Sequence, residues 1–194
     1  MSPSIGGLVP PLVTPLTPQG KLDVPALERL LDHVLRAGVH GVFMLGTTGE
    51  AYPLSESLRR DVVDATARIL KGRVPLYVGV GDAEPSRVQA HAEAAAKSGA
   101  DYIVLISPAY FDYAPAELST YFAEMSARMP KPVVLYNNPG ITRNPITPEV
   151  LQPLFTAKNV VGIKDSTGAA DISNRGIVQL AKYPHFRWFE GIDT

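Results

Sequence analysis

The chain has 194 residues, of which 45% are hydrophobic and 19% are charged, and its formal net charge is -1; it is long enough to bury one sizeable core. It contains no cysteine, which excludes a disulfide framework, a thiolate nucleophile and a cysteine-ligated zinc site. Near-neutral charge without a basic block is untypical of nucleic-acid-binding proteins, and no stretch has the length and apolarity of a membrane span or a secretory leader. We therefore expect a cytoplasmic protein whose partner is a small molecule.

Seven short apolar runs, rich in β-branched residues, recur along the chain and predict β-strands. In chain order they are Leu8–Val13, Val42–Leu45, Leu76–Val80, Tyr102–Ile106, Val133–Tyr136, Val160–Lys164 and Phe186–Glu190. The last residues of successive runs lie 26 to 35 positions apart. This spacing predicts strands that are each followed by a helix, since such a unit takes roughly thirty residues.

Between these runs the apolar spacing changes to the period of a helix. The first helical segment begins after Asp23 and ends at Gly38, because an aspartate side chain can accept from free N–H groups at a helix start and glycine commonly follows a helix end. Further helices are predicted after Ser55, Ser86, Ala114 and Thr147, and another over Asp171 to Lys182. The predicted order is therefore an alternation of strands and helices.

This alternation continues without a break in composition, so we expect residues 1–194 to form a single α/β domain on a parallel sheet. Two folds fit, a (β/α)8 TIM barrel and a doubly wound open sheet. Dinucleotide-binding open sheets need a GxGxxG loop after the first strand, whereas Gly79–Glu84 follows the third run and lacks the last glycine. The barrel is therefore favoured. Because a barrel needs eight strands and typically about 250 residues, we expect it to be truncated after the seventh strand, without the eighth strand and the C-terminal helices.

Lys164 lies at the end of an apolar run, where a lysine can be held partly away from water. Its amine can then attack carbonyl carbons, as in Schiff-base chemistry. The alternative is a structural tether, with the side-chain stem on apolar surface and the ammonium group in water. Tyr136 at the end of another run, and the loop Gly46–Glu50 after a third, favour the reactive interpretation. Three strand ends thus carry an amine, a phenol and anion-binding groups.

Three segments, Gly46-Thr47-Thr48-Gly49-Glu50, Tyr136-Asn137 and Gly162-Ile163-Lys164-Asp165, together resemble those of the dihydrodipicolinate synthase and N-acetylneuraminate lyase family. The resemblance covers essentially the whole chain in order, including Pro11–Pro15 and Ser107–Tyr110. It implies a (β/α)8 barrel and a class I aldolase. In such an enzyme Lys164 would form a Schiff base with the keto carbon of pyruvate or a related 2-keto acid.

The resemblance also implies roles for the other strand-end residues. Tyr136 would move protons as a general acid and base, and Thr47 and Thr48 would hold the carboxylate of the keto acid. Thr47 is also a candidate proton relay for the phenol. Gly46 and Gly49 would let the loop aim its backbone N–H groups at the carboxylate. The alternative is a tight strand-to-helix turn that needs glycine for backbone freedom.

Tyr110 follows the fourth run and matches the position at which a tyrosine of this family reaches across a dimer interface into the neighbouring site. Its alternative role is ordinary packing, since Tyr110–Tyr113 is an aromatic cluster. The resemblance thus implies that Tyr110 is catalytic, and we expect a homodimer or a homotetramer.

One position departs from the family pattern. In dihydrodipicolinate synthase an arginine five residues after the active-site tyrosine helps to bind the second substrate's carboxylate, whereas this chain has Ile141 there. Arg143 lies two residues further on, where a solvated loop charge is the simpler interpretation. Asp165 and Ser166 stand where the synthase pattern often has Glu-Ala. These differences argue against aspartate semialdehyde as the acceptor and favour a sugar acid or a hydroxy-keto acid.

The leading prediction is a Schiff-base lyase or aldolase that acts on pyruvate or a related 2-keto acid. It needs no cofactor, since the iminium itself withdraws electrons. It needs no metal, since the four histidines lack the spacing of metal ligands. The same residues also fit a condensation of the 4-hydroxy-tetrahydrodipicolinate synthase type or a keto-acid dehydration. A truncated barrel leaves one more alternative, a non-catalytic fragment that only binds or assembles.

Overall fold

Within residues 5–192, which the computed structural model describes apart from the side chains of residues 170–173, six parallel strands lie side by side in chain order. They are β1 (Val42–Met44), β2 (Leu76–Gly79), β3 (Tyr102–Ile106), β4 (Val133–Asn137), β5 (Val160–Asp165) and β6 (Arg187–Glu190). Each neighbouring pair is parallel. A doubly wound sheet reverses its strand order at a switch point, so the consecutive order confirms the barrel type of sheet.

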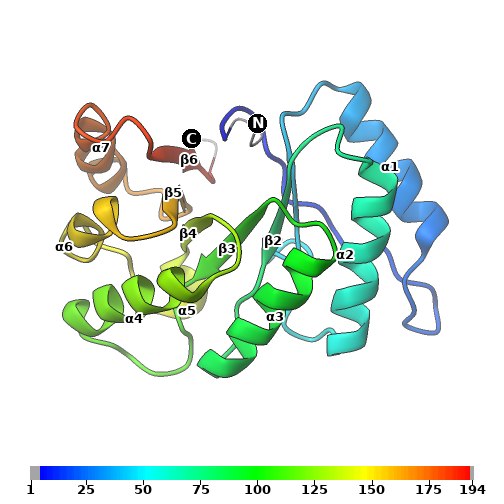
Figure 1. Ribbon diagram of the computed structural model, residues 1–194, viewed down its shortest axis with the longest axis horizontal. Helices are drawn as coiled ribbons and strands as arrows, with labels where there is room; N and C mark the ends of the chain where they lie inside the picture. Colours follow the sequence, from blue (N-terminus) through cyan, green and yellow to red (C-terminus); the bar gives the residue numbers. More distant parts are fainter. Residues whose placement is uncertain (1–4, 193–194) are drawn as a thin grey trace.

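The sheet curls so that its two edges approach each other. Residues 6–11 lie beside β1, residues 187–191 include the opposite edge strand, and both segments line one cavity of about 530 Å³. Figure 1 shows the start of the described chain close to β6, with the helices on the outside of the sheet. The inner face of the sheet therefore lines a hollow, as in a partly closed barrel.

The prediction of a first strand over Leu8–Val13 is wrong, because this segment forms no regular strand. It makes a single parallel bridge, in which Pro11 pairs with Phe43 of β1. The Leu12 N–H donates to the Phe43 carbonyl at 2.9 Å, and the Phe43 N–H donates to the Pro10 carbonyl at 3.0 Å. Two adjacent prolines have no N–H to donate, so the ladder cannot extend through them. The other six predicted runs are β1 to β6, and each end lies within one residue of the prediction.

The long helices follow the predicted order. They are α1 (Val24–Arg36), α2 (Glu56–Leu70), α3 (Pro85–Lys97), α4 (Pro115–Arg128) and α7 (Ala170–Gln179). Asp23 begins α1 as predicted, because its carboxylate accepts from the Ala26 N–H at 2.9 Å. Helix α3 begins before Ser86 and not after it, since the carboxylate of Glu84 accepts from the first free N–H groups of that helix. Helix α7 ends at Gln179, before the predicted Lys182.

The connection between β4 and β5 is less regular than predicted. The helix expected after Thr147 ends after one turn as α6 (Pro148–Leu151) and continues as the 3-10 helix η1 (Gln152–Thr156). Pro153 lies in this second part, where it lacks an N–H and its ring crowds the preceding turn, which explains the change of helix type. A further single turn, α5 (Pro139–Thr142), is an element that the apolar pattern does not predict.

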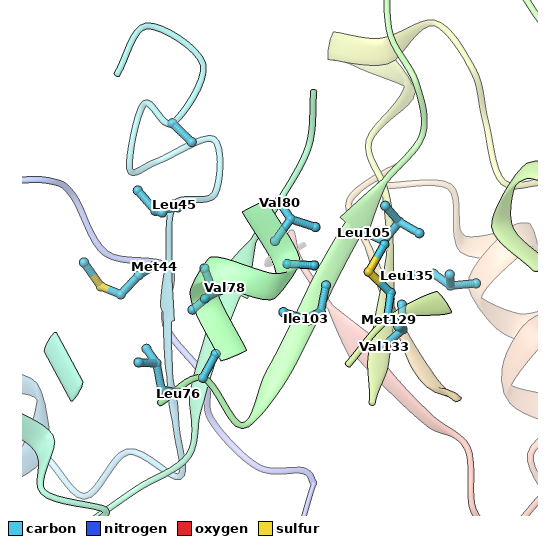
Figure 2. Packing of buried hydrophobic residues seen from close by; sticks show 14 of the residues in the cluster. Met44, Leu45, Leu76, Val78, Val80, Ile103, Leu105, Met129, Val133 and Leu135 are labelled. Atoms are coloured by element: carbon cyan, nitrogen blue, oxygen red, sulfur yellow. The ribbon is translucent and has the colours of Figure 1, made fainter. Parts of the chain in front are cut away.

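Two apolar layers hold the sheet in place, because side chains alternate between the two faces of a strand. Figure 2 shows part of the outer layer, which packs between the sheet and the helices; it includes Met44, Leu76, Val78, Ile103 and Leu135. The inner layer comprises Phe43, Tyr77, Tyr102, Val104, Ile106, Val134 and Tyr136. Each fully buried aliphatic or aromatic side chain contributes about 1.5–3 kcal/mol. The outer layer therefore anchors the strands whose opposite faces carry the inner residues.

Across residues 5–192 no helix has both the length and the apolar character needed to cross a membrane. In the same part of the chain no group of three or more His, Asp or Glu side chains is placed to hold a metal ion.

Candidate active site

Lys164, Tyr136 and Thr47 lie together at the carboxyl ends of their strands. Tyr136 on β4 pairs in register with Lys164 on β5. Nζ of Lys164 lies 4.0 Å from the centroid of the Tyr136 ring, so the cation faces the electron-rich side of the ring. Thr47, in the turn after β1, has its Oγ1 3.5 Å from the Tyr136 hydroxyl. The structure thus brings together three of the predicted site residues from three different strands.

The Tyr136 phenol is buried, with 6% of the residue exposed. Besides Thr47, it contacts Asn138, whose Nδ2 donates to the phenol oxygen at 3.0 Å. Burial raises the pKa of this phenol, whereas its hydrogen bonds and the positive charge of Lys164 lower it, and the net pKa lies below the ordinary value of tyrosine. A phenol with a lowered pKa gives up its proton more readily, which suits a general acid and base. Sequence reasoning missed Asn138, although a polar residue directly after the strand end is the signal that could have indicated it.

The Lys164 amine is held from a second side. Nζ donates to Ser166 Oγ at 2.9 Å. Gly191 lies against the amine, since a Cβ built there would be 3.0 Å from Nζ and 2.8 Å from the carbonyl oxygen of Asp165. Any side chain at this position would first displace the Ser166 hydroxyl that accepts from the amine, because Ser166 Oγ is the atom nearest to such a Cβ. Sequence reasoning did not select Gly191, although a glycine directly after the last predicted strand is a signal for such a close approach.

Asp165 lies beside Lys164 in the chain but on the opposite face of the strand, and it is fully buried. Its carboxylate accepts from Asn137 Nδ2 at 2.9 Å and from Thr167 Oγ1 at 2.9 Å. The Asn137 amide also bonds both backbone groups of Ile146. These contacts fasten the ends of β4 and β5 together, which fixes the spacing between the phenol and the amine.

The loop Gly46–Glu50 is a tight turn after β1, as the sequence predicts. The reason for its glycines is space and not backbone freedom: a Cβ at Gly46 would be 2.8 Å from the Phe43 ring, and one at Gly49 would be 3.0 Å from the Leu12 carbonyl oxygen. The left-handed conformations flanking the turn belong to Leu45 and Glu50, with φ of 57° and 50°.

Thr47 and Thr48 are exposed at the tip of this turn. Neither of their N–H groups donates to a backbone carbonyl within residues 5–192. Free N–H groups and hydroxyls at one tip are a suitable cradle for a carboxylate. Thr48, Gly46 and Gly49 lie in the same turn as Thr47, whose Oγ1 is 3.5 Å from the Tyr136 hydroxyl, on the loop that was predicted to bind an anion.

A cavity of about 240 Å³ lies at the carboxyl ends of the first strands and is lined by Tyr136 and Thr47. Its apolar lining includes Phe43, Leu45, Val104, Ile106 and Ile141. Among the described residues that line it, Glu50 is charged and none is a lysine or an arginine. Lys164 lines the larger hollow inside the sheet, and Phe43 and Val104 line both spaces. The amine and the phenol thus face adjoining spaces.

Tyr110 does not lie with the other predicted site residues of its own chain. Its side chain is 80% exposed, its φ is 84°, and its ring packs edge to face on Phe111 with the centroids 4.9 Å apart. Arg143 pairs with Asp112 at 3.1 Å, and both side chains are exposed, which matches the interpretation of Arg143 as a solvated loop charge.

A comparison with protein families settles the relationship. The model described as the dihydrodipicolinate synthetase family matches residues 4–194. The chain belongs to this family. The family resemblance predicted from the three strand-end segments is therefore confirmed, and so is the barrel fold.

Individual family members are similar over most of the chain. YagE of Escherichia coli K12, whose name assigns it provisionally as a 2-dehydro-3-deoxy-D-gluconate aldolase, is 33% identical over 190 residues, which are 96% of this chain. The 4-hydroxy-tetrahydrodipicolinate synthase of Xanthomonas axonopodis pv. citri is 37% identical over 163 residues, or 84% of this chain. The chain spans 63% of the length of YagE and 54% of that of the Xanthomonas enzyme.

Solved structures of the family show the same fold. The crystal structure of E. coli YagE in complex with pyruvate superposes with a TM-score of 0.92 at 32% identity, covering 96% of this chain and 63% of YagE. A monomeric dihydrodipicolinate synthase variant superposes with a TM-score of 0.91 at 31% identity, covering 96% of this chain and 63% of the variant.

Proposed function

We propose that the protein is a Schiff-base-forming lyase or aldolase that acts on pyruvate or a related 2-keto acid through Lys164. The observation that carries this proposal is the contact of Lys164 with Tyr136, with Nζ 4.0 Å from the ring centroid. A nucleophile and an acid–base group within reach of one substrate are what carbonyl addition requires. The crystal structure of the family member YagE is a complex with pyruvate, which supports the same substrate class here.

In the proposed reaction the unprotonated Lys164 amine attacks the keto carbon, and Tyr136 supplies a proton to the keto oxygen. A proton moved from Nζ to this oxygen lets it leave as water, and an iminium forms between Nζ and the former keto carbon. The Tyr136 phenolate then takes the proton of the hydroxyl group on the second carbon from the iminium carbon. The iminium withdraws electrons, so the bond between the first and second carbons from the iminium carbon breaks, releasing an aldehyde and leaving an enamine. Tyr136 returns a proton to the enamine carbon, and water releases pyruvate and the free amine.

The turn after β1 would hold the substrate by its carboxylate. Thr47 and Thr48 would supply N–H groups and hydroxyls, while Gly46 and Gly49 keep the backbone close enough to present them. Thr47 would also relay the proton of Tyr136, since its Oγ1 lies 3.5 Å from the phenol oxygen. Binding and proton transfer would thus share one residue.

The cavity beside Tyr136 supports cleavage of a sugar acid over condensation with an acidic aldehyde. Ile141 lies in its lining, and no described lining residue is a lysine or an arginine that could pair with a second carboxylate. An anion in this apolar space would lose its hydration without gaining a counter-charge. We therefore propose a 2-keto-3-deoxy sugar acid as the substrate, which is the class named for YagE.

We also propose that the active form is at least a dimer. The aromatic rings of Tyr110 and Phe111 are 80% and 65% exposed at adjacent positions, which is unusual for a monomer surface and typical of an interface. In such an assembly Tyr110 would enter the site of the neighbouring copy as a further member of the proton relay.

Borohydride reduction in the presence of pyruvate tests the proposal. The iminium is trapped as a stable amine, and mass spectrometry of the digested protein locates it. We expect one pyruvate adduct, on Lys164, in the unmodified protein and none in Lys164→Met. An unmodified protein that is folded by circular dichroism and gives no adduct would overturn the proposal and favour the non-catalytic alternative.

A second assay separates the direction of the reaction. Release of pyruvate from a 2-keto-3-deoxy sugar acid is compared with condensation of pyruvate and aspartate semialdehyde, at equal enzyme concentration. We expect release to be the faster reaction. Faster condensation would identify a synthase and would contradict the substrate assignment while leaving the Schiff base intact.

A further inference from the structure

The segment between β3 and α4, residues 107–114, contains Tyr110 and has no helix or strand of its own. Tyr110 adopts a left-handed conformation with φ of 84°. For a bulky residue this conformation costs of order 1–3 kcal/mol, and an irregular exposed segment would relax out of it unless other contacts held it. Those contacts come from the first part of the β4–β5 connection, directly after α5.

The side chain of Asn144 is the contact that holds this segment. Asn144 is 1% exposed. Its Nδ2 donates to the carbonyls of Pro108 at 2.9 Å and Phe111 at 2.7 Å, and its Oδ1 accepts from the Tyr113 N–H at 2.9 Å. A single amide thus bonds the backbone on both sides of Tyr110. A side chain needs both donors and an acceptor for this, which restricts the position to an amide.

The same residue is linked to the phenol through α5. The Asn144 N–H donates to Thr142 Oγ1 at 3.3 Å, and Thr142 Oγ1 donates to the Asn138 carbonyl at 3.2 Å. The side chain of Asn138 then donates to the Tyr136 hydroxyl at 3.0 Å. Hydrogen bonds, joined through the covalent frames of Asn144 and Asn138, therefore connect the segment that carries Tyr110 with the proposed general acid and base on β4.

We propose that Asn144 is a positioning residue that holds Tyr110 in its left-handed conformation and in a defined place relative to the β4 strand end. The inference rests on the proposed function, because the role of Tyr110 in proton transfer does. Asn144 touches neither the substrate nor the reacting atoms; it acts by fixing where the Tyr110 ring is presented. A residue that acts through another one should lose its effect when that other residue is removed.

An ion pair between the same two segments provides a matched control. Arg143 pairs with Asp112 at 3.1 Å, but the two side chains are 70% and 68% exposed. Exposed pairs contribute little to stability. Arg143→Gln removes this contact at the position next to Asn144, and it should leave both the segment and the reaction unchanged.

The three hydrogen bonds of the Asn144 side chain with the carbonyls of Pro108 and Phe111 and the N–H of Tyr113 form a clamp on this segment. Two variants remove this clamp in different ways. Asn144→Asp keeps the size of the side chain and the acceptor for the Tyr113 N–H, but it loses the donors to the Pro108 and Phe111 carbonyls. Asn144→Ser shortens the side chain without burying a charge, and it serves if the aspartate variant does not fold. Hydrogen exchange of residues 108–114 gives the first readout. We expect faster exchange there in both clamp variants and unchanged exchange in Arg143→Gln.

The second readout isolates the proton-transfer step. Exchange of the pyruvate methyl protons in heavy water needs the Schiff base and then removal of a proton, whereas borohydride trapping needs the Schiff base alone. In Asn144→Asp we expect methyl exchange to slow by roughly 10-fold to 100-fold, since small displacements of a reacting group cost this much. The yield of the Lys164 adduct should remain as in the unmodified protein.

A double variant decides whether Asn144 acts through Tyr110. Tyr110→Phe should slow methyl exchange at least as much as Asn144→Asp, and the double variant should be no slower than Tyr110→Phe alone. Additive losses, or unchanged hydrogen exchange of residues 108–114 in the clamp variants, would overturn the inference. Absence of a Lys164 adduct in the unmodified protein would instead contradict the proposed function, and hydrogen exchange would still test the clamp.

Discussion

Tyr136 and Lys164 are paired in register on adjacent parallel strands, and the amine of Lys164 lies over the Tyr136 ring, 4.0 Å from its centroid. The ring face holds the cation, while the hydroxyl contacts Thr47 and Asn138. The aromatic ring and its hydroxyl therefore have separable roles. One places the nucleophile, with an attraction of about 0.5–2 kcal/mol, and the other exchanges a proton.

Tyr136→Phe separates these two roles. The variant keeps the ring under the amine and loses the hydroxyl, so the fold and the position of Lys164 should persist. We expect turnover to fall by about 100-fold or more, since positioned acid–base groups contribute on that scale. Pyruvate release from the keto acid substrate is the measurement. Tyr183→Phe, at a tyrosine that stacks on Phe155, is the control, and full turnover in Tyr136→Phe would exclude the phenol as the acid–base group.

The lowered pKa of Tyr136 predicts that, in a spectroscopic titration of the tyrosines, one phenol ionises at a lower pH than an ordinary tyrosine; we call this the early component. Burial alone raises this pKa, but the hydrogen bond with Thr47 and the charge of Lys164 outweigh it. The phenolate is thus favoured in the folded protein, and this contribution to stability is present above the ordinary tyrosine pKa and is lost as the pH falls through the folded value. Tyr136→Phe should abolish the early component, and Thr47→Val should move it to higher pH. An early component that persists in Tyr136→Phe would belong to another tyrosine.

Strands were predictable here because each is a continuous apolar run. Ile103 and Val104, for example, are buried on opposite faces of β3, one in the outer layer and one in the inner layer. The Leu8–Val13 run has the same apolar character, but its two prolines remove the donors that a ladder needs. In the β4–β5 connection Pro153 likewise changed the helix type without altering the apolar pattern. Apolar periodicity predicts burial, and backbone donors decide whether a buried segment becomes a regular element.

The placement of the candidate site residues was also predictable, because they lie at strand ends or directly after them. That Lys164, Tyr136 and Thr47 lie together follows from this position, because the carboxyl ends of neighbouring parallel strands meet at one edge, whereas their proposed roles come from the family resemblance. Asn144 and Gly191 were not predictable, because their contacts form only when separate segments meet in the folded chain: Asn144 bonds a segment more than thirty positions earlier, and Gly191 lies against Lys164 across the β5–β6 pair. No local pattern marks such partners.

Gly191→Ala should disable the amine while leaving most of the fold intact. The added Cβ would overlap Ser166 Oγ, the hydrogen-bond acceptor of Lys164 Nζ, and would lie 2.8 Å from the Asp165 carbonyl oxygen and 3.0 Å from Nζ, so the Ser166 hydroxyl has to move away from its place beside the amine. We expect a loss of about 1–3 kcal/mol in the free energy of unfolding, as for other overpacked sites, and a much lower yield of the borohydride adduct. Gly140→Ala, where the nearest atom within reach is 3.6 Å away, is the control. An adduct yield equal to that of the unmodified protein would show that the amine tolerates the displacement.

A largely buried polar pair, between Asp82 after β2 and His91 on α3, predicts how stability depends on pH. Nε2 of His91 lies 3.3 Å from Oδ2 of Asp82, and both side chains are 11% exposed. Burial and the charge of Arg59 lower the pKa of His91 more than Asp82 raises it, so the net pKa lies below the ordinary 6.5. At neutral pH the contact is therefore a hydrogen bond of a neutral imidazole and not an ion pair.

The sign of the pH effect follows from that lowered pKa. The unfolded chain binds a proton at His91 before the folded chain does, so this contribution to stability is present above pH 6.5 and is lost as the pH falls through the folded pKa. Melting temperatures measured from pH 7 to pH 5 should fall, and His91→Gln should reduce the slope. The pKa of Asp82 is also lowered, although burial opposes this. The pH range in which Asp82 affects stability therefore lies below 3.8 and does not overlap with the range of His91. An unchanged slope in His91→Gln would assign the effect to other groups.

Ile141→Arg tests whether the apolar cavity sets the choice of acceptor. Ile141 is 47% exposed at the cavity rim, so an arginine can place its guanidinium there without burying it. A charge-assisted hydrogen bond to a carboxylate contributes about 1.5–3 kcal/mol, so kcat/KM for condensation with aspartate semialdehyde should rise by roughly 10-fold or more relative to an uncharged aldehyde. Ile141→Met, which keeps the cavity uncharged, is the control. An equal gain for both aldehydes in Ile141→Arg would mean that this side chain affects access to the cavity and not recognition of the acceptor's charge.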